Sequence, residues 1–160
     1  YYQKVLDAVR KSESTIIFTI RYEGISLEED LIRLVRNDVK ILIDVRRNPL
    51  SMKFGFSKTL LQKYCNALDI EYLHFPDVGI ESDKRQELNN QSDYDKLFDD
   101  YKKSTIPKTL ETQNKILDLL KSKKRIALTC FEADTCQCHR THLAEALHSN
   151  QSFSFDVKHI

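Results

Sequence analysis

Short apolar runs alternate with amphipathic stretches, and this alternation constrains the fold more than any other feature of the sequence. The runs cover residues 15–20, 40–45, 70–75 and 125–130, and an aromatic run follows at 153–158. The first run is a continuous apolar, β-branched run, which is typical of a strand buried on both faces, and the second is of the same buried type. The pattern predicts an α/β fold: a mostly parallel sheet of about five strands with helices on both faces, in a three-layer, Rossmann-like arrangement.

The stretches between the runs have the periodicity of helices. Ser26 and Glu29 form a capping box, with serine at the N-cap and glutamate three residues later. Pro107 stands where the first turn of a helix tolerates proline. We expect helices over residues 1–12, 27–37, 57–68, 92–104, 107–122 and 138–149.

Length and charge limit the classes of protein to which the chain can belong. The 160 residues fit a single α/β domain spanning 1–160. The net charge of +1 creates no global field that attracts nucleic acid or a membrane, so any anion must be recognised locally. No apolar run is long enough to cross a bilayer, and the start shows no secretory signal. We therefore expect a cytoplasmic protein with no membrane partner, whose four cysteines are reduced.

Polar residues collect directly after the predicted strands. They are Arg21 and Tyr22 after the first strand, Asp44, Arg46 and Ser51 after the second, Gly79 after the third, and Cys130, Glu132, Cys138, His139 and Arg140 after the fourth. Right-handed crossovers bring the carboxyl ends of parallel strands to one edge of the sheet. Ligands bind at that edge in folds of this kind. The convergence predicts one electropositive site built from distant segments.

The segment 129–140 carries the reactive groups of this predicted site. Arg140 falls in the first turn of a helix, where anions bind, and its guanidinium, like that of Arg46, suits phosphate or carboxylate. Glu132 is the candidate general acid or base. Cys138 lies at the helix start, which favours the thiolate, so Cys138 or Cys130 is the candidate nucleophile. Arg21, Asp44, Ser51, His139 and Tyr22 complete the predicted substrate-binding set.

A structural interpretation of the same residues stays open. Asp44 or Glu132 would then pair with an arginine and fix the loops, because a buried carboxylate needs a partner. Cys138 would be a small buried residue at a tight turn, as Cys65 is expected to be in its helix. The segment is not a tyrosine-phosphatase loop, because Cys130 is followed five and six residues later by Thr135 and Cys136.

A metal site at this segment is a further alternative. Cys130, Cys136, Cys138 and His142 lie close together in sequence, and zinc prefers such ligands. The spacing is not C-x-x-C, and no second pair of ligands exists. We therefore predict no metal site.

Two ordered motifs resemble those of a known family. The segment 44–51, Asp-Val-Arg-Arg-Asn-Pro-Leu-Ser, is similar to the D-V-R-x-x-P-x-S signature of the DUF488 family, and Cys130-Phe-Glu with Cys138-His-Arg resembles its C-x-E and C-H-R signatures. Tyr72, Gly79 and the terminal His159-Ile160 also resemble family positions. Where the family usually has T-I-G-H-S, this chain has Thr19-Ile20-Arg21-Tyr22, which places a cation in the first loop. The resemblance implies the fold and the positions of the site, but no reaction.

Two classes of function therefore remain open. The first is a hydrolase or group-transfer enzyme acting on a phosphorylated or nucleotide-like substrate. The second is a binding or sensor module for a small anion or a nucleic-acid end, or one that responds to metal or redox state through its cysteines. No G-x-G-x-x-G or Walker motif occurs, so we expect no cofactor. Nucleic acid is the less favoured partner, and the sequence specifies no oligomeric state.

Overall fold

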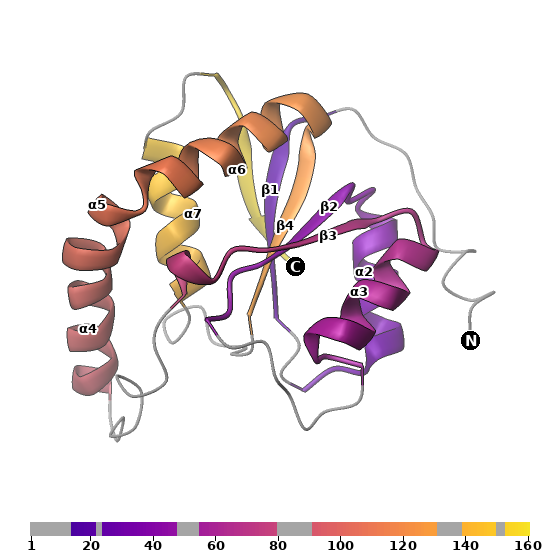
Figure 1. Ribbon diagram of the computed structural model, residues 1–160, viewed down its shortest axis with the longest axis horizontal. Coiled ribbons are helices and arrows are strands. Elements are labelled where there is room, and N and C mark those ends of the chain that lie inside the picture. Colours follow the sequence, from indigo (N-terminus) through magenta and orange to yellow (C-terminus); the bar gives the residue numbers. More distant parts are fainter. Residues whose placement is uncertain (1–13, 22–23, 48–54, 80–90, 131–138, 150–152) are drawn as a thin grey trace.

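The sheet is five-stranded and entirely parallel, as the sequence predicts. A computed structural model of the chain describes residues 14–21, 24–47, 55–79, 91–130, 139–149 and 153–160 (Figure 1). The strands are β1 Ile16–Arg21, β2 Ile41–Asp44, β3 Glu71–His74, β4 Arg125–Cys130 and β5 Asp156–His159, in the spatial order β3-β2-β4-β1-β5. Every neighbouring pair is parallel. Since β4 lies between β1 and β2, segments distant in sequence meet at the centre.

The helices follow the predicted sequence order, and the boundary between the helices predicted over 92–104 and 107–122 lies at Thr109, whose dihedrals are not helical. They are α2 Leu27–Arg36, α3 Lys58–Ala67, the 3₁₀ turn η1 Pro76–Val78, α4 Gln91–Asp100, the π-helical turn η3 Tyr101–Thr105, α5 Ile106–Lys108, α6 Leu110–Lys123 and α7 His139–Ser149. Pro107 lies in the first turn of α5, where the missing N–H is tolerated. The helix expected over 1–12 lies outside the described residues.

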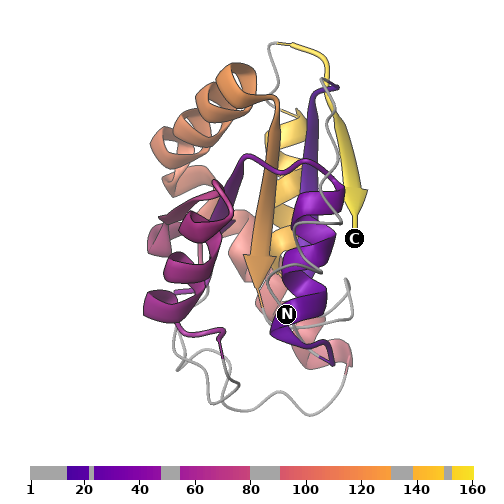
Figure 2. The ribbon, with the colours of Figure 1, turned by 90° about the vertical axis from the view of Figure 1, so that its right-hand side faces the viewer.

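Two apolar layers separate the sheet from its helices. On one face, Leu34 of α2 and Leu61 of α3 pack with Phe18 and Leu42 of the strands. On the other face, helices α6 and α7 contribute a second cluster that includes Ile116, Leu120, Leu143 and Leu147. Figure 2 shows α2 and α3 in front of the sheet and α7 behind it. This is the predicted three-layer arrangement.

The last strand lies later in the chain than the sequence predicts. The expected strand over 153–158 was placed by its aromatic residues, but β5 begins at Asp156. Phe155 is buried instead in the cluster beneath α7, where it contacts Phe153 and the ring of His148. The aromatic residues therefore close the core before the strand starts, and the strand itself is exposed and polar.

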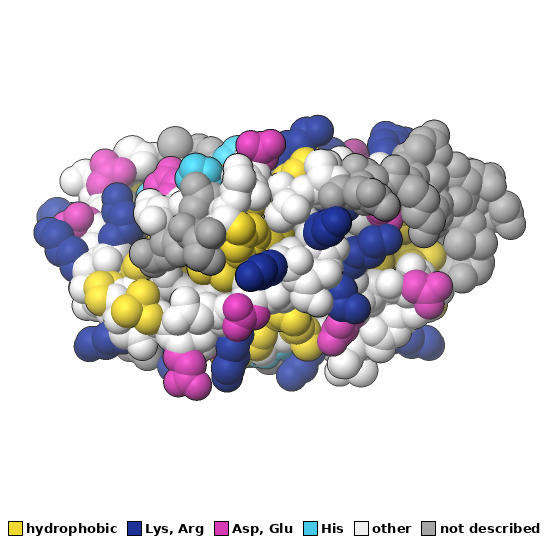
Figure 3. Space-filling view, turned by 90° about the horizontal axis from the view of Figure 1, so that it is seen from above, with side chains coloured by type: hydrophobic (Ala, Val, Ile, Leu, Met, Phe, Trp, Pro, Cys, Tyr) yellow, Lys and Arg dark blue, Asp and Glu magenta, His cyan; other side chains and the backbone are white. Residues whose placement is uncertain are grey.

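The amino ends of the strands form the end of the molecule opposite the predicted site. Figure 3 looks onto this end and shows lysine and arginine side chains interspersed with acidic ones. Lys121, Lys123 and Lys124, near the end of α6, are exposed, as expected for a solvated helix terminus. None of the described helices combines the length and the apolar character that crossing a membrane requires.

Candidate functional site

Chain topology singles out one position at the carboxyl edge of the sheet. β2 and β4 are neighbours, but β2 leads to α3 on one face whereas β4 leads to α7 on the other. When the loops after two adjacent strands lead to opposite faces of a sheet, they leave a crevice between them. Ligands of open α/β sheets bind in this crevice. Of the residues that the sequence singles out, Asp44 ends β2 and Cys130 ends β4 at this position.

A buried ion pair stands at the end of β2. Asp44 and Arg46 are 0% and 7% exposed, and their side chains meet through two hydrogen bonds, Nε to Oδ1 at 2.8 Å and Nη2 to Oδ2 at 2.6 Å. Arg46 Nη1 also donates to the carbonyl oxygen of Phe56 at 2.7 Å. The guanidinium therefore ties the end of β2 to the chain that enters α3. This is the structural role that the sequence leaves open for Asp44.

Tyr72 completes this buried cluster from the neighbouring strand β3. Its hydroxyl donates to Oδ2 of Asp44 at 2.5 Å. Burial first, and then the charge of Asp44, raise the pKa of Tyr72, so the phenol stays protonated and remains a donor. In the sequence, Tyr72 stands out only as a family position. Its place on the strand next to Asp44, on the same face of the sheet, is the feature from which this contact could be predicted.

The loops after β2 and β3 are packed directly against each other. Nε2 of His74 lies 2.7 Å from the carbonyl oxygen of Arg46, so this nitrogen carries the proton of the hydrogen bond. A side chain at Gly79 would place its Cβ 2.5 Å from the backbone nitrogen of Arg47 and 2.8 Å from the carbonyl oxygen of Val45. Only glycine permits this approach, which explains the predicted importance of Gly79.

Arg21 ends β1 on the face covered by α7. Ile17 belongs to the apolar cluster on that face and Ile20 to the other cluster, so alternation along the strand places Arg21 on the α7 side. Its Nη1 donates to the carbonyl oxygen of Ile160 at 3.2 Å. Its Nε is buried and has no hydrogen-bond partner in the described part of the chain. Within the described part of the chain, the Nε donor of Arg21 is therefore unsatisfied.

Arg140 lies in the first turn of α7 and is 1% exposed. A cation at a helix start opposes the helix dipole, so its burial requires compensating negative charge or acceptors. The register pairs Arg21 with Cys130, the last residue of β4 before the segment that leads to α7. The predicted arginines therefore lie on two different faces of the sheet. Arg46 lies on the α3 face, whereas Arg21 and the helix that carries Arg140 lie on the α7 face.

Several predicted site residues lie outside the described residues. These are Tyr22, Ser51, Glu132, Cys136 and Cys138, together with the side chains of Cys130 and His139. Cys65 is described, and its thiol is a fully buried core group, as predicted. Burial first, and then the carboxylates of Asp30 and Asp44, raise the pKa of Cys65, so this thiol is inert. Within the described ranges, no His, Cys, Asp and Glu side chains form a cluster that could hold a metal ion.

The fold and these positions define a parallel α/β protein whose polar groups gather at the carboxyl ends of its strands. Residues 26–147 match the family model described as domain of unknown function DUF488. The chain belongs to this family. Neither the search of curated proteins nor the search of solved structures gives a match.

Proposed function

We propose that this protein is an enzyme that binds a small phosphorylated or nucleotide-like substrate at the carboxyl edge of the sheet. The observation that carries the proposal is the buried, unpartnered Nε of Arg21 beside the strand that leads to Arg140. Two guanidinium groups on one side of the sheet suit the oxygens of a phosphate group. The start of α7 adds backbone N–H donors with the same preference for anions.

In this proposal the two faces of the sheet have different tasks. Asp44, Arg46 and Tyr72 hold the loops after β2 and β3 in place, and Ser51, on the continuation of that loop, contributes a hydroxyl to the substrate. Arg21 and Arg140 bind the anionic group, assisted by Tyr22 and His139. Glu132 transfers the proton, and Cys138 or Cys130 is the nucleophile if a covalent intermediate forms. Hydrolysis or group transfer fits these groups.

Binding is tested by replacing Arg21. We expect Arg21→Gln to weaken the binding of phosphate esters and nucleotides by about tenfold or more, because it removes a charge-assisted donor pair. Arg36→Gln is the matched control, since Arg36 is an exposed arginine at the end of α2. Equal affinities in the two variants, measured by calorimetry, would contradict the proposed anion site.

Turnover is tested with a panel of phosphomonoesters, phosphodiesters and nucleotides. We expect Glu132→Gln to abolish turnover. Loss of turnover in Cys138→Ser as well would identify a thiol nucleophile, whereas activity that persists in Cys138→Ser would leave Glu132 acting on water. Ligand binding without turnover of any compound would overturn the enzyme proposal in favour of a sensor module.

A further inference from the structure

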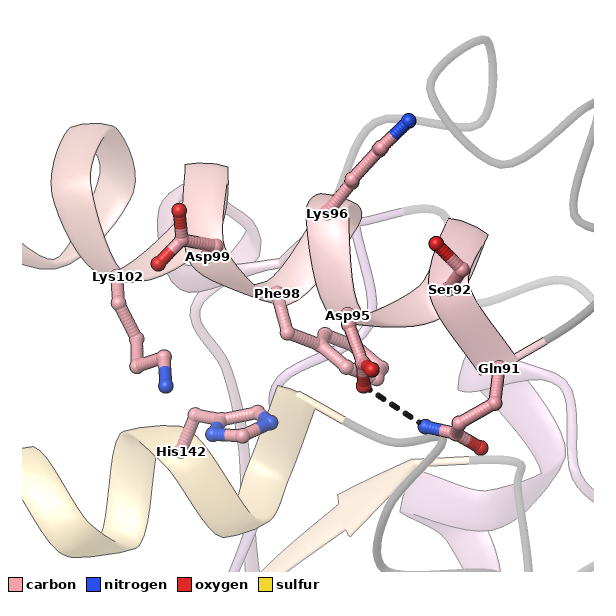
Figure 4. A pocket seen from close by; sticks show the side chains of 8 residues that line it. All are labelled: Gln91, Ser92, Asp95, Lys96, Phe98, Asp99, Lys102 and His142. Atoms are coloured by element: carbon pink, nitrogen blue, oxygen red, sulfur yellow. Dashed lines mark hydrogen bonds between the residues drawn. The ribbon is translucent and has the colours of Figure 1, made fainter.

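A polar pocket of about 560 Å³ lies between α4 and η3 on one side and α7 on the other. Its lining includes Asp95, Lys96, Phe98, Asp99, Lys102 and His142. Figure 4 shows the imidazole of His142 forming the α7 side of this pocket, while the other labelled side chains come from the continuous α4–η3 helix. None of these residues belongs to the proposed substrate site, so the pocket is a separate feature of the fold.

His142 contributes two nitrogens to this pocket that have no protein partner. Both ring nitrogens are buried and make no hydrogen bond within the described part of the chain. The ring is fixed instead by its contact with Phe98, with centroids 4.8 Å apart. Buried polar atoms in native proteins are nearly always satisfied, so two on one ring require an explanation. A bound group that accepts a hydrogen bond from the ring would explain one of these nitrogens.

Lys102 supplies an uncommitted positive charge next to this ring. Its ammonium lies beside the imidazole in Figure 4, and it forms no ion pair with the described residues. The two carboxylates of the pocket already have partners, because Asp99 pairs with Lys103 at 2.8 Å and Asp95 accepts from the Gln91 amide at 2.9 Å. Lys102 is exposed, so its long side chain is able to move and admit a group to the ring.

We propose that the pocket between α4 and α7 binds a small oxyanion, held between the ammonium of Lys102 and the imidazole of His142. The anion accepts hydrogen bonds from both groups and satisfies a ring nitrogen that the protein leaves unpaired. Phe98 forms the apolar wall against which the rest of such a molecule packs. This binding site is independent of the arginines of the proposed function.

Binding at this pocket is coupled to protonation of His142. Burial first, and then Lys102, lower the pKa of His142, whereas Glu145 acts in the opposite direction. The charged residues that line the pocket are Lys96, Lys102, Asp95 and Asp99 of the α4–η3 helix, and Lys102 and Glu145 are the charges that act on the His142 ring. An anion that stabilises the protonated ring raises its pKa, and by reciprocity lower pH strengthens anion binding.

Titration of the His142 ring protons by NMR tests the proposal, with inorganic phosphate as the probe and sodium chloride at equal ionic strength as the reference. His142→Gln assigns the resonance. We expect phosphate to raise the pKa of His142, and Lys102→Gln to weaken this response about tenfold. Lys108→Gln is the matched control, because Lys108 is an exposed lysine of α5 that does not line the pocket, and it should respond like the unaltered protein.

The result that overturns the proposal is a His142 titration that phosphate leaves unchanged, or changes equally in Lys102→Gln and Lys108→Gln. Arg21→Gln separates this site from the proposed substrate site. We expect it to weaken ligand binding at the sheet edge and to leave the response of His142 to phosphate intact. A phosphate response of His142 that disappears in Arg21→Gln would show that there is no second site and would overturn the proposal.

Discussion

At the scale of single residues, the molecule depends on buried charges that satisfy one another. The carboxylate of Asp44 accepts four hydrogen bonds in the described part of the chain, three from Arg46 and one from Tyr72, and all three residues are buried. The free energy lost when one partner of such a cluster is removed is larger than the free energy that the intact cluster contributes to folding. Removing one member leaves the other charge buried and uncompensated.

Asp44→Asn tests this asymmetry. The amide keeps the shape of the carboxylate but removes the charge opposite Arg46, so we expect the free energy of unfolding to fall by about 3–5 kcal/mol. Glu111→Gln is the control, because Glu111 and Lys115 are 3.9 Å apart and solvent-exposed, and its loss should stay within about 0.5 kcal/mol. Denaturant unfolding of both variants measures the difference. A similar small loss in Asp44→Asn would show that the buried pair contributes little.

This cluster also shows how far the sequence predicts the site. Asp44 and Arg46 are two apart in an extended chain, so their side chains share a face, and the sequence predicts that a buried Asp44 needs a partner. The sequence does not predict that Phe56 and Tyr72 complete the cluster. Both contacts depend on the positions of α3 and β3 after packing, which local periodicity does not encode.

At the scale of elements, the start of helix α2 follows from a capping motif that is recognisable in the sequence. Ser26 caps α2 through a hydrogen bond from the backbone N–H of Glu29 to its Oγ at 3.1 Å, as the capping box predicts. Ser57 precedes α3 in the same extended conformation but forms no side-chain cap hydrogen bond. Both serines thus have the backbone conformation of an N-cap, but only the side chain of Ser26 accepts a hydrogen bond from its own helix.

Ser26→Ala is expected to destabilise the protein by about 1 kcal/mol, because it leaves an N–H group at the start of α2 without its acceptor. Ser122→Ala, at an exposed position near the end of α6, is the control and should cost less than half as much. Thermal unfolding monitored by circular dichroism compares the two variants with the unaltered protein. Equal losses would show that the capping hydrogen bond is not the source of the effect.

Strand β5 begins later than the sequence predicts, because local propensity does not account for where side chains are buried. Phe153 and Phe155 have a high strand propensity, and the sequence therefore places the strand over them. In the structure both rings turn into the cluster beneath α7, and the polar residues after them pair with β1. Burial of aromatic surface outweighs the propensity of the backbone here.

At the scale of the whole molecule, the α4–η3 helix is attached to the central layers through few contacts. Tyr101 donates a hydrogen bond to the carbonyl oxygen of Val78 at 2.6 Å, and Phe98 packs on His142. Leu97, Phe98 and Tyr101 form an apolar cluster separate from the two main ones. The Phe98–His142 contact is therefore one of the described contacts that hold this helix against α7.

Stability should decline as pH falls because of this contact. Burial and Lys102 lower the pKa of His142 in the folded state, so the folded chain binds fewer protons at this group than the unfolded chain, whose value is about 6.5. The contribution of His142 to stability is fully present above the unfolded value and is lost as pH falls from that value through the lower pKa of the folded state. We expect the unaltered protein to lose more stability than His142→Gln between about pH 7 and pH 5.

Denaturant midpoints measured at several pH values in this range check the prediction. His148→Gln is the control, because His148 is an exposed histidine in the same helix α7, and it should keep the slope of the unaltered protein. Parallel slopes for the unaltered protein and His142→Gln would show that burial of His142 does not cause the loss of stability.

The strand order has a consequence for how the chain folds during synthesis. Both neighbours of β1 come from residue 125 onward, so a nascent chain that stops before β4 leaves the apolar run Ile16–Ile20 with two unpaired edges. β2 and β3, by contrast, are neighbours joined by a single helix and can pair early. β1 precedes the other described strands in the chain and is therefore among the last to be enclosed, so it is the segment that a chaperone would have to shield from other chains.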